Sequence, residues 1–211
     1  TSNISILQTR ILKKTGIQSI ANGVRNNSLA KTLVEQAGSD PNKVTKATVS
    51  ILESIINSKI TEKTNNQYMF FRWELASISD IANDLYDNRV KVIKALEECM
   101  TVADTKDVHQ WLMEVMVCTA KQSHLTEKDL AFKARVYAKK FDHVPADIMK
   151  YACDKVIMNC KFFPTVAEIN EYIEPMLHYR KSLVEAVSSK LISAIGAVSY
   201  THLTLPTSVP V

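Results

Sequence analysis

The sequence predicts an all-α protein, a globular multi-helix bundle with a capped helical hairpin as its C-terminal module. Only four glycines occur in 211 residues, while Ala, Leu, Ile, Lys and Glu are plentiful, a balance that favours helices over turn-rich strands. Hydrophobic residues recur at three- and four-residue spacing along most of the chain. With 46% hydrophobic and 23% charged residues, the composition is that of an ordinary globular protein.

The first forty residues predict short helices separated by glycines. One of these helices, over residues 29–38, ends in Gly38, a residue type that favours the position just after a helix. Asp40 followed by Pro41 then indicates a new helix start, an N-cap and a proline at the first helical position. This helix should run to residue 60, since one face carries Val44, Ala47, Thr48, Ile51, Leu52, Ile55, Ile56 and Ile60.

The middle of the chain predicts a linker and then more helices. Residues 61–67 are polar and predict the linker. Hydrophobic residues then resume close to a 3.6-residue period, which predicts helices over residues 68–88, 89–100 and 105–120. Trp73 and Trp111 lie on the apolar faces of this pattern, so we expect both to be core residues.

Two helices are predicted between residues 126 and 160. Thr126 and Asp129 have the spacing of a capping box, and the helix they open should reach about Lys140. Its expected inward residues are Ala131, Phe132, Val136 and Tyr137. Pro145 should open the next helix, whose expected buried stripe is Ile148, Ala152, Val156 and Cys160.

A sharp turn is predicted at residues 161–164, Lys-Phe-Phe-Pro. Thr165 and Glu168 form a second capping-box pattern, so the next helix should begin at Val166, and Pro164 prevents continuation from the helix before it. One of Phe162 and Phe163 should fill the core while the other faces outward as a protein-contact point. The plainer interpretation is that both rings pack between the two helices.

The helix after this turn contains a proline. Pro175 should kink it near Glu171 or end it near Glu174. An apolar stripe continues beyond the proline. We expect a partner-binding surface made of the turn and this stripe: Lys161, Phe162, Phe163, Met176, Tyr179, Arg180 and Leu183.

The sequence lacks recognisable catalytic motifs. No phosphate-binding G-x-x-x-x-G-K-[ST] loop, G-x-G-x-x-G, H-E-x-x-H or G-x-S-x-G occurs, so we expect no enzyme activity and no cofactor. The four cysteines form no C-x-x-C pair and no zinc-ligand spacing with histidine, which indicates free thiols in a reducing cytoplasm and no metal. No apolar run reaches the roughly 18 residues of a membrane span.

Positive charge is concentrated near the start of the chain. Residues 1–63 carry nine Lys or Arg against four Asp or Glu. A basic face could bind phosphates or an acidic partner, and a solvated helix surface is the plainer interpretation. The candidate nucleic-acid-binding residues are Arg10, Lys13, Lys14, Arg25, Lys31, Lys43 and Lys46.

Both ends of the chain look incomplete or foreign. The chain begins with Thr1, so we expect the true N-terminus to be missing. Residues 199–211 contain no charged residue and no helical period, and they resemble the translated read-through of a sequencing adapter in assembled metagenomes. We therefore expect an N-terminal helical region over residues 1–104, a helical module over residues 105–198, and a non-native unstructured tail.

The second module carries a family resemblance. Lys161, Phe162, Phe163, Pro164, Thr165, Glu168 and Ile169 match its turn, and Tyr137, Pro145, Asp147 and Ala152 match more loosely. In this pattern the chain, over about residues 108–183, resembles phage and prophage DNA replication proteins related to replicative helicase loader and inhibitor proteins. The resemblance implies a non-enzymatic module that binds the hexameric replicative helicase in the cytoplasm of a bacterial host.

Two functions thus follow from the sequence. The first is a phage replication adaptor that binds the helicase to load or regulate it at an origin, with the first hundred residues as an adaptor for DNA or for an initiator protein. The alternative is a helical DNA-binding regulator that uses the basic N-terminal segment. Salt-tolerant binding that depends on an aromatic residue would favour the first, whereas affinity that falls steeply with salt would favour the second.

Overall fold

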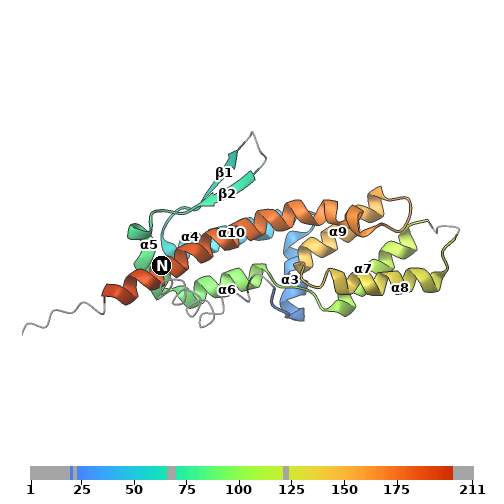
Figure 1. The fold of residues 1–211 in the computed structure, drawn as a ribbon, viewed down its shortest axis with the longest axis horizontal. Coiled ribbons are helices and arrows are strands. Elements are labelled where there is room, and N and C mark those ends of the chain that lie inside the picture. Colours follow the sequence, from blue (N-terminus) through green and yellow to red (C-terminus); the bar gives the residue numbers. More distant parts are fainter. Residues whose placement is uncertain (1–19, 21–22, 66–69, 121–123, 202–211) are drawn as a thin grey trace, which may run out of the picture. The chain divides into compact units, whose positions relative to one another are not determined.

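The described residues form a predominantly helical protein. A computed structural model describes residue 20 and residues 23–65, 70–120 and 124–201 (Figure 1). They form eight helices and one two-stranded sheet, so the predicted all-α class is confirmed. In chain order the elements are α3 (Asn27–Ala37), α4 (Asn42–Ile56), β1 (Thr61–Asn65), β2 (Phe70–Glu74), α5 (Ile78–Asp87), α6 (Arg89–Cys99), α7 (Thr105–Cys118), α8 (Glu127–Lys140), α9 (Ala146–Asn159) and α10 (Val166–Thr201).

The chain divides into two compact units, each built from separate segments. Among the described residues, the hairpin unit comprises residues 49–95 and 182–201, and the helical unit comprises residues 20, 23–48 and 96–181. This division differs from the predicted one between residues 104 and 105. The difference arises because each unit draws its core from segments that are distant in sequence, which local patterns do not reveal.

The helical unit is held together by a core of aliphatic and aromatic side chains. Helix α7 packs on α8 and on α9, and α3 packs on α9. The predicted buried residues Ile148, Ala152 and Val156 are fully buried on α9, whereas Cys160 is half-buried and ends that helix. Removal of this apolar surface from water, at about 25 cal/mol per Å², is the main stabilising contribution.

The hairpin unit contains the only sheet in the described part of the chain. Strands β1 and β2 are antiparallel, with Thr61 opposite Glu74. The predicted linker is therefore wrong over residues 61–65 and the predicted helix is wrong over residues 70–74, while residues 66–69 lie outside the described residues. Trp73 is buried while Arg72 and Glu74 are exposed, which is the two-residue alternation of a strand. Trp73 is thus a core residue as predicted, but on a strand.

Helix α10 continues through its proline. It runs from Val166 to Thr201 with Pro175 inside it, so the predicted end near Glu174 is wrong. Pro175 is exposed while Ile173 and Leu177, on either side of it, are buried. Burial of this stripe offsets the backbone hydrogen bond that proline cannot donate. The helix also includes the first three residues of the predicted tail, and residues 202–211 lie outside the described residues, as do residues 1–19.

Candidate partner-binding surface

The turn between α9 and α10 is fixed by backbone contacts with the end of α7. The N–H of Ala120 donates a hydrogen bond of 2.8 Å to the carbonyl of Lys161, and a β-bridge pairs Ala120 with Phe162. These contacts belong to the backbone and do not depend on the side chain of Phe162. The turn between α9 and α10 is thus fastened to the segment that follows α7.

Both predicted capping boxes are confirmed. Glu168 Oε2 accepts hydrogen bonds from Thr165 N at 2.7 Å and Thr165 Oγ1 at 2.8 Å, while Thr165 Oγ1 accepts from Glu168 N at 3.2 Å. Thr126 and Asp129 make the same reciprocal bonds at the start of α8. Pro164 is buried directly before the second box. These hydrogen bonds satisfy helix N–H groups that have no partner within the helix.

The second capping box should make stability depend on pH. Hydrogen bonds from the Thr165 backbone N–H and hydroxyl hold the pKa of Glu168 below its ordinary 4.5. The carboxylate therefore stabilises the fold above pH 4.5, and this stabilisation is lost as the pH falls through the lowered folded-state pKa. A Glu168→Gln variant should be about 0.5–1 kcal/mol less stable than the wild type at pH 7 and nearly equal to it near pH 2, in urea unfolding followed by circular dichroism.

Glu171→Gln is the matched control for this prediction. Glu171 lies on the same helix and is exposed, and its side chain makes no hydrogen bond to another described residue. Its substitution should change stability by a few tenths of a kcal/mol at most. Equal effects of the two substitutions at pH 7 would contradict a specific role for the box.

The two phenylalanines of the turn face in different directions. Phe163 is 3% exposed, and its ring centroid lies 5.8 Å from that of Tyr137 on α8. The Lys133 amine lies over both rings. Phe162 is 40% exposed, and the Lys161 amine lies 5.4 Å from its ring centroid. The structure therefore has one buried and one outward ring, and the plainer interpretation with both rings packed is wrong.

The rest of the predicted partner surface is largely buried. Tyr179, Arg180 and Leu183 are all buried on α10, and Met176 is half-buried. Phe163 is also too buried to contact a partner directly. An apolar stripe at helical spacing usually faces the core, and that is what this one does. Of the seven predicted residues, Lys161 and Phe162 remain exposed.

Arg180 is the centre of a buried hydrogen-bond cluster in the helical unit. Its guanidinium donates to both oxygens of Asp147 on α9, at 2.7 and 2.5 Å. It also donates to Thr45 Oγ1 at 3.1 Å and to the carbonyls of Cys99 and Pro41, each at 2.9 Å. Arg180 and Asp147 are both fully buried, so this ion pair has a structural and not a docking role.

The charge of Arg180 is stabilised despite its burial. Burial acts to lower the pKa of the guanidinium, but the charge and hydrogen bonds of Asp147 outweigh it, and the pKa is raised. Burial also raises the pKa of the neighbouring Cys99 thiol to about 11. The signal for this cluster in the sequence was one charged residue inside each apolar stripe, Asp147 before Ile148 and Arg180 after Leu177.

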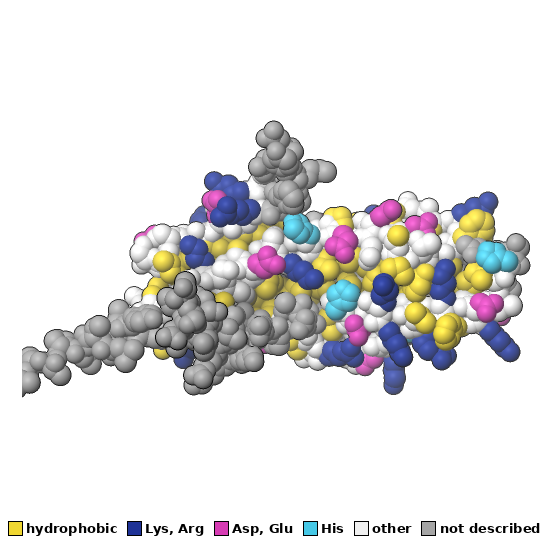
Figure 2. Space-filling view, viewed as in Figure 1, with side chains coloured by type: hydrophobic (Ala, Val, Ile, Leu, Met, Phe, Trp, Pro, Cys, Tyr) yellow, Lys and Arg dark blue, Asp and Glu magenta, His cyan; other side chains and the backbone are white. Residues whose placement is uncertain are grey.

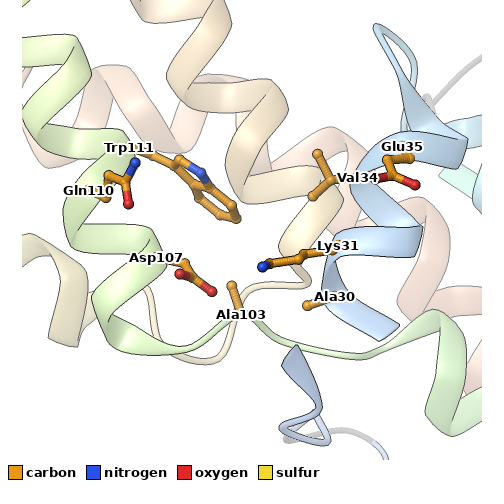
Figure 3. A pocket seen from close by; sticks show the side chains of 8 residues that line it. All are labelled: Ala30, Lys31, Val34, Glu35, Ala103, Asp107, Gln110 and Trp111. Carbon is orange, nitrogen blue, oxygen red and sulfur yellow. The ribbon is translucent and has the colours of Figure 1, made fainter. Parts of the chain in front are cut away.

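A pocket of about 340 Å³ lies between α3 and α7 (Figure 3). Its lining is Ala30, Lys31, Val34, Glu35, Ala103, Asp107, Gln110 and Trp111. Trp111 is half-buried and forms one wall, so it is a less complete core residue than predicted. Figure 3 shows the Lys31 amine directed toward Asp107.

Four of the seven basic residues predicted to bind nucleic acid lie in the described part of the chain, before or on α3 and on α4. Arg25 precedes α3 and lies 3.4 Å from Asp142, and Lys31 lines the pocket. Lys43 and Lys46 are exposed on α4. The remaining three, Arg10, Lys13 and Lys14, lie outside the described residues. DNA binding by this segment stays a prediction.

Two hydrophobic residues of α8 that were expected in the core are exposed. Phe132 is 65% exposed and Val136 is 46% exposed, so their predicted inward orientation is wrong. Tyr137 is buried as predicted, together with Leu130, Ala134 and Ala138. The buried side and the exposed side of α8 both carry hydrophobic residues at helical spacing. The large side chains of Phe132 and Val136 indicated the exposed side as the inward one.

Two general features of the described residues bear on function. None of the helices in the described ranges is long and apolar enough to cross a bilayer. Within the same ranges, no three His, Cys, Asp or Glu side chains are grouped so that they could hold a metal ion.

In comparisons with known proteins, the chain matched no family model, no curated protein and no solved structure.

Proposed function

We propose that this chain is a non-enzymatic phage replication adaptor that binds the replicative helicase in the bacterial cytoplasm and helps to load or regulate it at an origin. The observation that carries the proposal is the outward Phe162 on a turn fixed by the Ala120–Lys161 hydrogen bond. The resemblance of residues 108–183 to helicase loader and inhibitor proteins supports the choice of partner. DNA or an initiator protein is a further partner of the same adaptor.

Phe162 has the properties of a binding hot spot. Aromatic residues dominate interface energetics, and an anchor that is already ordered loses little conformational entropy on binding. The capping box and the Ala120–Lys161 bond supply this order before any partner arrives. Lys161 beside the ring adds a charge suited to an acidic rim on the partner.

The proposal is tested by co-elution with a helicase. Residues 1–198 are mixed with a bacterial replicative helicase hexamer at 50 and 500 mM salt and analysed by size-exclusion chromatography with light scattering. We expect a complex that survives high salt. Phe162→Ala should weaken it by about 2 kcal/mol or more, roughly 30-fold in Kd, because the interface loses its anchor.

Phe132→Ala is the matched control, since it removes another exposed phenylalanine from the same unit. It should leave helicase binding unchanged, and thermal unfolding should show that both variants remain folded. A wild-type chain that does not bind the hexamer, or a Phe162→Ala variant that binds equally well, would refute the proposal. Binding to DNA alone, lost at high salt, would favour the alternative function.

A further inference from the structure

The outward face of α8 combines positive charge with exposed hydrophobic residues. Its members all lie on the side opposite the buried one: Lys128, Phe132, Arg135, Val136, Lys139 and Lys140, all exposed. Figure 2 shows Lys and Arg side chains beside hydrophobic ones along the lower right edge, where Figure 1 labels α8. We call this set the α8 face.

The cations of the α8 face are not neutralised. No ion pair joins Lys128, Arg135, Lys139 or Lys140 to another described residue. The two acidic residues of α8, Glu127 and Asp129, both lie in its first turn, and neither forms an ion pair with these cations. By contrast, Lys150 on α9 is paired with both Asp154 and Glu114. The α8 face is therefore free to bind an anion.

The exposed hydrophobic residues narrow the choice of anion. Phe132 lies one turn from Lys128 on one side and one turn from Arg135 on the other, so its ring is flanked by cations. A ligand that matches this face needs negative charges and flat apolar rings at alternating positions. Single-stranded nucleic acid has both, since phosphates bind cations and bases stack on aromatic rings.

We propose that the α8 face binds single-stranded DNA, with the cations on phosphates and a base stacked on Phe132. Duplex DNA hides the faces of its bases and should bind more weakly. No Ser, Thr, Asn or Gln occurs in α8, so the face lacks the uncharged polar groups that would recognise a 2′-hydroxyl. No side chain of the face therefore selects RNA over DNA, and DNA is the assigned ligand.

This inference does not rest on the helicase proposal. The α8 face and the turn use different residues, and each can be altered without the other. Phe162→Ala should leave DNA binding unchanged, and Phe132→Ala should leave helicase binding unchanged. The failure of one proposal is therefore distinguishable from the failure of the other.

The first measurement is the salt dependence of binding. Fluorescein-labelled (dT)20 is titrated with the full chain at 50 and 200 mM NaCl, and fluorescence anisotropy is followed. Four phosphate contacts give a log–log slope of about −2.8, or a loss of roughly 50-fold in affinity over this range. Duplex DNA of equal length should bind more weakly than (dT)20. The RNA (rU)20 should bind no better than (dT)20.

Three variants locate the site. Phe132→Ala should weaken binding of (dT)20 by about 5-fold or more through loss of stacking. Arg135→Glu/Lys139→Glu should reduce the salt slope to about half, since two of four contacts are removed. Lys59→Glu/Lys91→Glu is the control with the same change in net charge at exposed lysines outside α8, and it should retain the wild-type slope.

Several outcomes would overturn the inference. The chain could fail to bind (dT)20 at 50 mM NaCl, the two double variants could change the salt slope equally, or Phe132→Ala could bind (dT)20 with wild-type affinity. Poly-glutamate is included as an acidic polypeptide without bases. If it competes with (dT)20 as well as unlabelled (dT)20 does, the face recognises charge in an acidic protein and not single-stranded DNA. Thermal unfolding confirms that each variant is folded.

Discussion

Arg180→Met should lower the free energy of unfolding by about 3–5 kcal/mol, because it leaves a charge buried without its partner. Asp147 would keep its place inside the core with no cation beside it. Thr45 Oγ1 and the carbonyls of Cys99 and Pro41 would also lose their donor. A domain of this size is stable by only about 5–15 kcal/mol, so this loss is a large fraction of its total stability. Urea unfolding followed by circular dichroism measures the loss.

Two further variants separate the buried charge from the change in size. Lys150→Met alters a partly exposed ion pair on α9 and should cost less than about 1 kcal/mol. Arg180→Met/Asp147→Leu removes both charges and should be more stable than Arg180→Met alone. It should not regain the full wild-type stability, because the two carbonyls remain without a donor. An Arg180→Met variant whose free energy of unfolding is within about 1 kcal/mol of the wild-type value would contradict this view of the cluster.

The features that could be predicted from the sequence are those fixed by neighbours within one helical turn. Both capping boxes followed from three-residue spacings, because the donor and acceptor belong to the same short segment. The end of α3 at Gly38 followed likewise from a residue that adopts positive φ easily. Such local hydrogen bonds hold whatever the rest of the fold does.

Features that depend on distant contacts were not predictable in this way. Helix α8 has two apolar stripes at helical spacing, and only the packing of α7 decides which one is buried. Arg180 lies in an apolar stripe, and its partner Asp147 is 33 residues away. The strands β1 and β2 include three of the few aromatic residues of the chain, which also fit a helical period. The hydrophobic period alone does not distinguish a strand from a helix in so short a segment.

Gly23→Ala should have the second large effect, a loss of about 2–5 kcal/mol, because two unfavourable contributions act at the same residue. Gly23 has φ of +76°, which side chains other than glycine rarely adopt. A methyl group there would also lie 2.4 Å from Val102 Cγ1 and 2.9 Å from the carbonyl oxygen of Met100. Val102 is buried and its N–H donates to Val24, so the neighbour has little room to move.

Gly196→Ala makes the same chemical change where neither contribution exists. Gly196 lies inside α10, and no atom is within 4 Å of where its methyl group would be. Alanine there should raise the free energy of unfolding by about 0.5–1 kcal/mol, since it favours the helix and restricts the unfolded chain. Urea unfolding should show a lower free energy of unfolding for Gly23→Ala and a higher one for Gly196→Ala. This result would show that the contact with Val102 and the positive φ constrain position 23. A Gly23→Ala variant as stable as the wild type would show that the segment before α3 does not pack against Val102.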